Sequence, residues 1–505
     1  MANALKQLAG ETAIYGLSTI LARVINFLFV PFYTRLLVPE QYGVVTELLA
    51  YIAVLQVALV MGLETGCFRF ASKEGIDKDK VYTNAFLSVF AVNAAFLALL
   101  VIFVKPLAAA LGYAGYEACL LYAGGTLLLD NVTAILFARL RQEHKAVKFA
   151  VVKTAKILTE TGVNLFLFLS PWKPQWMYRF VSPEPNFDYV IFAIFVSSVV
   201  CALLMLPEWL RIFRPRTPAS PADGTGPATN GRTGLLDRAL LREMLLYSLP
   251  LMVAALPGIF NDFMDRILFR FLDGSAEGWR ASLGVFQAGV KLAVIMNLFI
   301  QMFRFAAEPF FFQRAADKNS PQLYATVMNW FTAFCGLVFL GVVLYMDLIG
   351  LILGKDFRAG VSIVPIMLLA YMVLGMNFNV SMWYKLSGKT SMAIWITMAG
   401  LLVTTAVNVL FMPAFSYRAA AWGHLASYLV MLLISASLGA KYYPIPYDWK
   451  KLALLLVLML GIYALSLFTD PFLPGGAFWL KMGVHTLFLA LYALPAWYLL
   501  RRRSS

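Results

Sequence analysis

The sequence predicts an all-α integral membrane protein with about 14 membrane-spanning helices, and three observations support this fold class. Of the 505 residues, 61% are hydrophobic and only 13% are charged, whereas soluble domains carry about 25% charged residues. Many stretches contain the roughly 20 apolar residues that a helix needs to cross a bilayer. Residues 214–236 (RPRTPASPADGTGPATNGRTGLL) interrupt this pattern, because prolines and glycines replace almost all large apolar residues.

The hydrophobic segments divide the chain into two membrane-embedded halves. Six spans are expected before the linker and eight after it, at about 13–35, 43–66, 82–104, 117–138, 149–170, 188–210, 245–271, 282–306, 324–346, 360–384, 390–412, 418–440, 451–469 and 477–499. An even number of spans places both termini on one side of the membrane. The expected parts are residues 1–213, the flexible linker 214–236, residues 237–442, and 443–505 with two additional spans and a basic tail.

Lys and Arg residues indicate the orientation. If the N-terminus is cytoplasmic, the inward segments carry more than twice as many Lys and Arg residues as the outward segments, as the positive-inside rule requires. Both termini and the linker are therefore expected in the cytoplasm. The net charge of +14 is largely explained by this topology, so nucleic-acid binding has no support. The first residues, MANALKQLAGETAIYG, lack the apolar core of a removable signal peptide.

Motifs for metal, nucleotide or disulfide chemistry are weak. Residues 350–356 (GLILGKD) are one residue too short for a phosphate-binding P-loop and lack the Ser or Thr after the lysine. The histidines and cysteines have no ligand or disulfide spacing; they are His144, His424, His485, Cys67, Cys119, Cys201 and Cys335. No metal site and no cofactor are expected.

Several charged residues fall inside the predicted spans, where each costs about 2.5–3.5 kcal/mol on insertion scales. Arg23 and Lys291 lie deepest and are expected to face a polar cavity, because snorkelling to the headgroups is hardest there. Polar residues recur at helical spacing on four spans. These stripes are Thr19, Arg23 and Asn26; Lys153, Lys156, Glu160 and Asn164; Asp262, Asp265 and Arg266; and Gln287, Lys291, Asn297, Gln301, Arg304 and Glu308.

In a bilayer, the polar side chains of such stripes find hydrogen-bond and ion-pair partners only when they face the interior of the protein. Single residues of this kind are as often fasteners between helices, but stripes in both halves favour a shared, hydrated cavity. Asp262 and Arg266 are four residues apart and are expected to pair.

The excess of cations in the first half suits a phosphorylated lipid headgroup, because Arg binds phosphate through two parallel hydrogen bonds and Lys acts as a point charge. The expected substrate contacts are Arg23, Asn26, Arg69, Lys153, Lys156, Glu160, Lys291 and Arg304. The residues expected to act in gating or ion coupling are Asp262, Asp265, Arg266 and Glu308.

Five segments resemble the polysaccharide-transporter (O-antigen flippase-like) family of the multidrug/oligosaccharidyl-lipid/polysaccharide exporter (MOP) superfamily. They are residues 14–17 (IYGL) with Arg23, 31–43 (PFYTRLLVPEQYG), 261–266 (NDFMDR), 284–291 (GVFQAGVK) and 303–311 (FRFAAEPFF). The resemblance covers nearly the whole chain, including the span count and the central linker.

This resemblance implies two pseudo-symmetric six-helix lobes around a central cavity, plus two C-terminal helices, working by alternating access. It implies a transporter rather than an enzyme, which moves undecaprenyl-diphosphate-linked oligosaccharide from the cytoplasmic to the periplasmic leaflet of the bacterial inner membrane. The implied partners are this lipid-linked oligosaccharide, membrane lipids and other polysaccharide assembly proteins. No cofactor is implied, and coupling to an H⁺ or Na⁺ gradient is left open.

Two other classes remain open from the sequence. An ion-coupled multidrug exporter of the same superfamily would share the fold but favour an acidic, aromatic cavity, against which the Arg and Lys excess of the first half argues. A membrane glycosyl polymerase or ligase would present a large outward loop with catalytic groups. The longest outward loop here, about 171–187, has the aromatic and proline content of an interfacial belt and turn.

Overall fold

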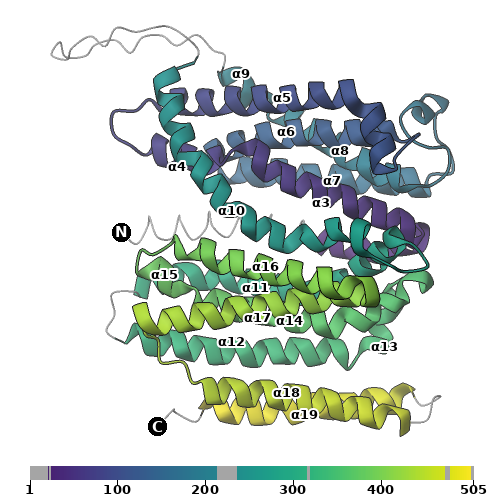
Figure 1. Cartoon of the computed structure of the whole chain (residues 1–505), viewed down its shortest axis with the longest axis vertical. Coiled ribbons are helices and arrows are strands. Elements are labelled where there is room, and N and C mark those ends of the chain that lie inside the picture. Colours follow the sequence, from purple (N-terminus) through teal and green to yellow (C-terminus); the bar gives the residue numbers. More distant parts are fainter. Residues whose placement is uncertain (1–20, 22–23, 213–235, 315–318, 473–477, 502–505) are drawn as a thin grey trace. The chain divides into compact units, whose positions relative to one another are not determined.

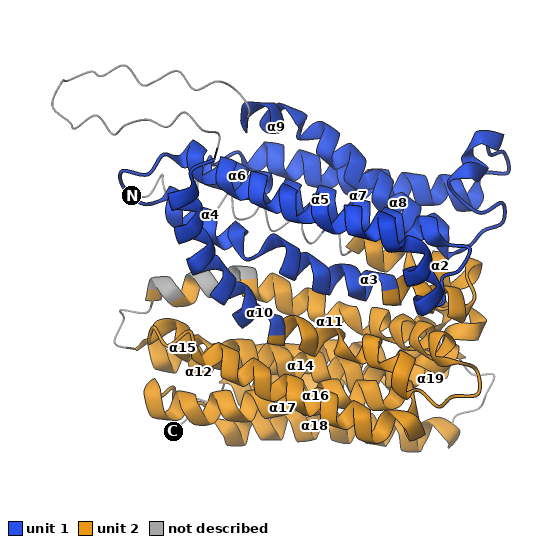
Figure 2. Cartoon of the chain, turned by 45° about the horizontal axis from the view of Figure 1, so that its top comes forward, with its two compact units in different colours: residues 1–22, 48–256 blue, residues 23–47, 257–505 orange. Residues whose placement is uncertain are grey.

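The computed structural model describes residues 21, 24–212, 236–314, 319–472 and 478–501 (Figure 1). All regular elements in these ranges are helices. The chain forms two compact units, unit 1 with residues 1–22 and 48–256, and unit 2 with residues 23–47 and 257–505 (Figure 2). The boundaries fall inside helices α3 (Pro39–Val60) and α10 (Arg238–Leu272). Residues 213–235, nearly all of the expected linker, lie outside the described residues, and the division into lobes at 214–236 stays a prediction.

Twelve helices in the described ranges are long and apolar enough to cross a membrane, and each coincides with one of the expected spans. Residues 13–20, 22 and 23 of the expected span 13–35 lie outside the described residues, and its second half coincides with the shorter apolar helix Val24–Leu36. The expected span 149–170 corresponds to α7 (Ala146–Leu169), whose 24 residues suffice for a crossing. It is not among the twelve because Lys153, Lys156 and Glu160 interrupt its apolar sequence. The all-α membrane fold class is confirmed.

Unit 1 is built around α6, which packs against the helices beside it in sequence. Its helices are the second part of α3, α4 (Leu63–Ala71), α5 (Lys78–Leu111), α6 (Glu117–Gln142), α7, η1 (Gln175–Arg179), α8 (Phe187–Leu204), α9 (Leu206–Ile212) and the first part of α10. Side chains from α4, α5 and α6 form a buried core that includes Leu63, Phe86 and Ile135.

Glycine separates α3 from α4. Met61 and Gly62 have φ values of 56° and 68°, a left-handed conformation that favours glycine. In addition, a Cβ atom on Gly62 would lie 2.4 Å from the carbonyl oxygen of Ser248 on α10. The chain therefore turns here because position 62 carries no side chain, and α10 passes directly against the turn.

Helix α5 starts at a capped residue and bends at a proline. The Asp77 carboxylate accepts a hydrogen bond from the Asp79 amide at 2.9 Å, which satisfies one of the free amides at the helix start. Phe103 has non-helical angles (φ −104°, ψ 15°), just before Pro106, whose ring removes a donor and crowds the preceding turn.

An ion cluster closes the end of α6. The carboxylate of Glu143 accepts a hydrogen bond from Arg139 at 2.8 Å and pairs with Lys145 at 2.6 Å and Arg211 at 3.2 Å. Partial burial acts to raise the pKa of Glu143, but the hydrogen bonds from Arg139 and Lys145 and the Arg139 and Arg211 charges outweigh it and lower this pKa to about 2. The cluster ties α6, α7 and α9 together on the predicted cytoplasmic side.

Unit 2 contains the remaining helices. They are α2 (Val30–Leu36), the first part of α3, the second part of α10, α11 (Trp279–Arg314), α12 (Ser320–Val343), α13 (Met346–Ile349), η2 (Gly350–Ile352), η3 (Lys355–Ile363), α14 (Val364–Val380), α15 (Met382–Leu386), α16 (Met392–Phe415), α17 (Tyr417–Tyr442), α18 (Trp449–Thr469), η4 (Asp470–Phe472) and α19 (Phe478–Arg501). Helix α14 packs against α11, α12 and α17, and α16 packs against α17. The C-terminal pair α18 and α19 packs on α12 (Figure 1).

The start of α3 belongs to unit 2 because it crosses the start of α11 without intervening side chains. A Cβ atom on Gly43 would lie 1.9 Å from the Arg280 carbonyl oxygen, and one on Gly284 would lie 2.0 Å from the Pro39 carbonyl oxygen. Glu47, one turn beyond Gly43, is 1% exposed, and its carboxylate lies 3.9 Å from the Arg280 guanidinium.

Candidate functional site

Polar side chains, all of them buried except that of Asp262, join α10 to α16 and α17 in unit 2. We call Asn261, Asp262, Asp265, Arg266, Thr404, His424, Ser427 and Tyr428 the α10 polar cluster. At its centre, the Arg266 guanidinium donates a 2.9 Å hydrogen bond to the Asp265 carboxylate. The other Asp265 oxygen lies 3.2 Å from Nε2 of His424. Asp265 is fully buried, so this carboxylate is held between two basic side chains.

The two neighbouring polar residues of α10 face the other helices. The Asp262 carboxylate accepts a hydrogen bond from the Tyr428 hydroxyl at 3.1 Å. The Asn261 side-chain oxygen accepts hydrogen bonds from the hydroxyls of Thr404 at 2.6 Å and Ser427 at 2.9 Å. One face of α10 is thus fastened to both α16 and α17 by side chains at successive positions.

The expected pairing of the Asp262 and Arg266 side chains is wrong. Arg266 does reach back one turn, but it donates to the main-chain carbonyl oxygen of Asp262, while the Asp262 carboxylate is directed to Tyr428. The ion-pair partner of Arg266 is the adjacent Asp265. Spacing along one helix does not predict this pairing, because it also depends on α17. There, Tyr428 binds the Asp262 carboxylate and His424 lies next to the Asp265 carboxylate.

Aromatic rings enclose the charged centre. The Arg266 guanidinium lies 5.1 Å from the ring centre of Phe263 and 5.8 Å from that of Phe286. The Phe286 ring is stacked on His424 at 6.5 Å. Cation–π contacts gain strength where water is excluded, and here they support an arginine that is only 8% exposed.

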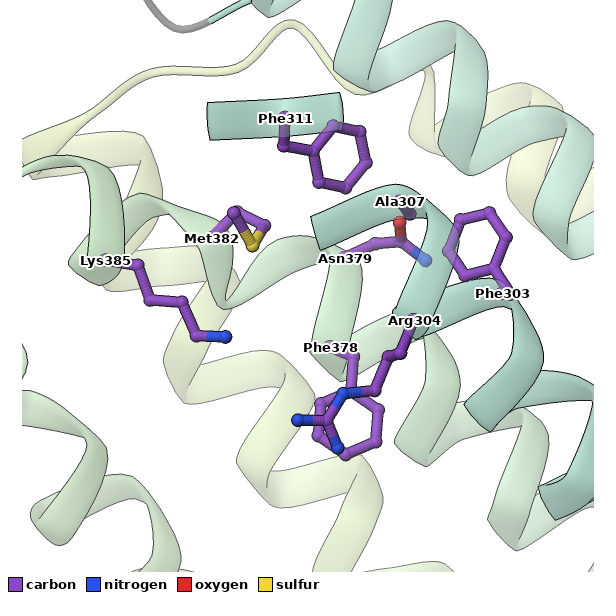
Figure 3. Close-up of a pocket in the computed structure, with 8 residues that line it drawn as sticks. All are labelled: Phe303, Arg304, Ala307, Phe311, Phe378, Asn379, Met382 and Lys385. Carbon is purple, nitrogen blue, oxygen red and sulfur yellow. The ribbon is translucent and has the colours of Figure 1, made fainter. Parts of the chain in front are cut away.

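A second site in unit 2 is a small pocket where α11, α14 and α15 meet (Figure 3). Its lining residues are Phe303, Arg304, Ala307, Phe311, Phe378, Asn379, Met382 and Lys385. The Arg304 guanidinium lies over the Phe378 ring at 4.0 Å. Figure 3 shows the charged ends of Arg304 and Lys385 directed into the same space. None of the eight lining residues is acidic, so this pocket suits an anion.

The expected cations of unit 1 contact neighbouring helices. Lys156 on α7 pairs with Asp130 on α6 at 2.5 Å. The Lys153 ammonium lies 4.6 Å from the ring centre of Phe137, also on α6. Arg69 on α4 lies over Tyr247 of α10 at 4.0 Å. All three side chains thus take part in contacts between helices.

The other expected site residues are scattered. Asn26 is exposed on the short helix Val24–Leu36, Lys291 is half-buried on α11, and the Glu160 carbonyl accepts a 2.9 Å hydrogen bond from Asn164. Arg23 lies outside the described residues. Glu308 is on α11, but its side chain also lies outside them. The structure therefore brings Asp262, Asp265 and Arg266 together and places Arg304 in a different pocket.

Sequence reasoning missed the partners on α16, α17 and α15. His424, Ser427 and Tyr428 lie at helical spacing on one face of α17, and Lys385 follows Asn379 on the polar side of the pocket. The polar stripes expected from the sequence are centred on charged residues, and the spacing of His424 from other histidines does not indicate a metal site. The same test applied to uncharged polar residues in apolar segments would have found the α17 stripe.

Comparison with known proteins supports this architecture. The family model described as "Polysaccharide biosynthesis protein" matches residues 8–315. The lipid II flippase MurJ in an inward closed conformation has a similar structure, with a TM-score of 0.69 at 12% identity over 96% of this chain and 99% of that chain. An inward-facing multidrug resistance MATE transporter of the MOP superfamily gives 0.61 at 12% identity over 83% of this chain and 94% of that chain.

No curated protein shows a significant sequence match. At 12% identity, the structural likenesses concern the fold, whereas the family model covers more than half of the sequence. The chain is therefore a multi-pass membrane protein that belongs to the family described as "Polysaccharide biosynthesis protein".

Proposed function

We propose that the chain is a flippase that moves undecaprenyl-diphosphate-linked oligosaccharide from the cytoplasmic to the periplasmic leaflet of the bacterial inner membrane, for the synthesis of O-antigen, capsule or exopolysaccharide. It works by alternating access, with both termini in the cytoplasm and without a catalytic residue. The family assignment and the MurJ-like fold support transport of a lipid-linked sugar. The observation that carries the substrate class is the cationic pocket of Arg304 and Lys385.

This pocket matches a diphosphate in charge and position. The guanidinium and the ammonium are directed into one space that has no acidic lining residue, and Arg and Lys form strong charge-assisted hydrogen bonds with phosphate oxygens. Both residues lie at the helix ends that the Lys and Arg distribution predicts to be cytoplasmic. A lipid headgroup entering from the cytoplasmic leaflet would meet them first.

The α10 polar cluster supplies the switching element in this proposal. A buried carboxylate that contacts both Arg266 and His424 can favour either partner as the helices move, which gives the two states that alternating access requires. Uptake of a proton or Na⁺ by Asp262 or Asp265 would couple this exchange to an ion gradient. Glu308, one turn after Arg304, belongs to the same gating set.

Export in cells that depend on this chain for surface polysaccharide tests the proposal. Arg304→Gln and Lys385→Gln, singly and together, are expected to lower export about tenfold or more, since each removes a charged hydrogen-bond donor. The matched control is Lys389→Gln, because Lys389 lies over the Tyr442 ring at 3.6 Å and does not line the pocket.

Purified protein in liposomes gives the direct readout, with a fluorescent lipid-diphosphate oligosaccharide as substrate. Wild type and Lys389→Gln should translocate it, and the double variant should not. Normal translocation by a well-folded double variant would remove the pocket from the mechanism. Efflux of cationic dyes without translocation of the lipid would instead make the chain a drug exporter.

A further inference from the structure

An apolar groove of about 500 Å³ runs between α16 and α17 in unit 2. Its walls are Val407, Phe411 and Phe415 from α16, and Ala419, Trp422 and Ala426 from α17. Because α16 and α17 are antiparallel neighbours, positions 407–415 and 418–426 cover the same depth. At 1.5 Å per residue this depth is about 12 Å, close to half of the roughly 30 Å hydrocarbon core of a bilayer.

One charged side chain, Arg418, lines the groove. It lies in the first turn of α17, directly after the tight turn at Ser416, whose φ is 48°. Arg418 is exposed, and among the described residues it takes part in no ion pair or side-chain hydrogen bond. Its charge is therefore left for a ligand, and the positive end of the α17 helix dipole adds to the same electrostatic preference.

The groove and the arginine have the geometry of a lipid site in one leaflet. The turn at Ser416 is expected on the periplasmic side, where Trp422 would lie at the level at which tryptophan is enriched in membrane proteins. A phosphate at the membrane surface would meet Arg418, and a chain attached to it would descend along Phe411 and Ala426. The single positive charge of Arg418 balances the single negative charge of a phosphodiester. The depth of the groove, about 12 Å, is close to the thickness of the hydrocarbon layer of one leaflet.

We propose that this groove binds an anionic phospholipid of the periplasmic leaflet, with its phosphate on Arg418 and an acyl chain between α16 and α17. This site shares no residue with the Arg304 pocket or the α10 polar cluster. It goes beyond the proposed transport activity, because a lipid held here remains bound while substrate passes elsewhere.

Native mass spectrometry of the purified full chain tests the headgroup contact, with phosphatidylglycerol and phosphatidylcholine as probes. Wild type is expected to retain phosphatidylglycerol about tenfold more tightly than phosphatidylcholine, because the choline cation beside the phosphate of phosphatidylcholine repels the Arg418 guanidinium and offsets the attraction of the phosphate. Arg418→Gln should abolish this preference. The matched control is Arg358→Gln, which removes another exposed arginine that does not line the groove. Equal retention of phosphatidylglycerol by wild type and Arg418→Gln overturns the proposal.

A second pair of variants tests the chain-binding part. Ala426→Phe fills the groove and should weaken phosphatidylglycerol binding, whereas Leu402→Phe enlarges a side chain that is 64% exposed on α16 and should not. Undecaprenyl phosphate is added as a competitor. If it displaces phosphatidylglycerol at lower concentration than phosphatidylglycerol itself, the groove belongs to the isoprenoid lipid and the phospholipid assignment is wrong.

Discussion

The backbone amide of Gly354 donates a hydrogen bond to the Thr34 hydroxyl at 3.0 Å, across 320 residues of sequence. The two backbones approach so closely that a Cβ atom at position 354 would lie 1.7 Å from the Thr34 carbonyl oxygen. Next to this contact, the Arg35 guanidinium donates to the Leu351 carbonyl oxygen at 3.1 Å. Helix α2 is therefore attached to the segment between η2 and η3 by direct backbone approach.

Gly354→Ala is expected to displace α2, because no movement of a flexible side chain can make room for the new methyl group. We expect a lower melting temperature and at least about a tenfold loss of export, since the displaced α2 loses its attachment to unit 2. The control is Gly341→Ala on α12, where a Cβ atom meets nothing within 4 Å; it should be neutral or stabilising by up to about 1 kcal/mol. Similar melting temperatures for the two variants would contradict the expected clash.

The Asp265–Arg266 pair predicts coupling between two adjacent residues. Asp265→Asn leaves a buried guanidinium without its carboxylate and should cost about 3–5 kcal/mol of stability. Combining it with Arg266→Gln should recover part of this loss, as measured by a double-mutant cycle on thermal unfolding and on export. Strictly additive losses would show that the pair is not coupled.

The matching cycle on Asp262 and Arg266 serves as control. Asp262→Asn keeps the main-chain carbonyl that accepts from Arg266 and an oxygen for Tyr428, so its effect on folding should be smaller than that of Asp265→Asn. Export should still fall, because a charge in the gating set is lost. A larger coupling energy for Asp262–Arg266 than for Asp265–Arg266 would favour the pairing expected from spacing alone.

Lys156 and Asp130 allow a fastener to be distinguished from a substrate contact. Asp130→Asn should destabilise unit 1 by about 1.5–3 kcal/mol, the range for a hydrogen bond with a charged group. The double apolar variant Asp130→Leu with Lys156→Met should regain stability, because no charge is left unpaired. We expect export to stay low in this variant, since the cation is gone. Recovery of export together with stability would make the pair a fastener only.

Glu143 predicts a pH dependence outside the membrane. Its pKa is lowered from 4.5 to about 2, so the ionised form is favoured by folding. This stabilisation is fully present above about pH 4.5 and is lost progressively as the pH falls towards 2. Glu143→Gln should lower the melting temperature at pH 7, and the difference from wild type should shrink from pH 4.5 to pH 3. A difference that grows in acid would contradict the sign of the shift. Glu184→Gln, in the exposed loop before α8, is the control.

The expected topology is tested by cysteine labelling. All four native cysteines are buried, so their removal provides a background with little perturbation of the surface. Ser220→Cys in the linker should react with an impermeant reagent only after the membrane is opened, whereas Glu184→Cys should react from outside in intact cells. The reverse pattern would invert the orientation and the proposed direction of transport.

Apolar runs and charge distribution predict the spans of this chain, because the bilayer imposes nearly the same length requirement on every helix. They also predict that charged residues such as Asp265 and Arg266 face protein rather than lipid. The 149–170 segment shows the limit of hydropathy alone, since α7 is a full-length helix that owes its polarity to Lys153, Lys156 and Glu160. Helical length and apolar content are separate properties in this segment.

Partners across helices are not predictable from one sequence. The partner of Asp265 on another helix is His424, 159 residues away, and the second cation that lines the Arg304 pocket is Lys385 from a short helix. Both arrangements depend on how α17, α15 and α11 cross. The spacing of residues within one helix carries no information about these crossings. The expected Asp262–Arg266 side-chain pair was wrong for this reason.

The attachment of residues 34–47 to unit 2 has a consequence for the order of events during synthesis. This early segment leaves the ribosome first. Its partners, Arg280, Gly284 and Gly354, follow only after more than two hundred further residues have been synthesised. Contacts between distant parts of a chain form late and slowly. The first membrane helices must therefore remain inserted beside lipid or a helper protein until α11 and η3 arrive, and the newborn chain completes its N-terminal packing only when more than two thirds of it has been translated.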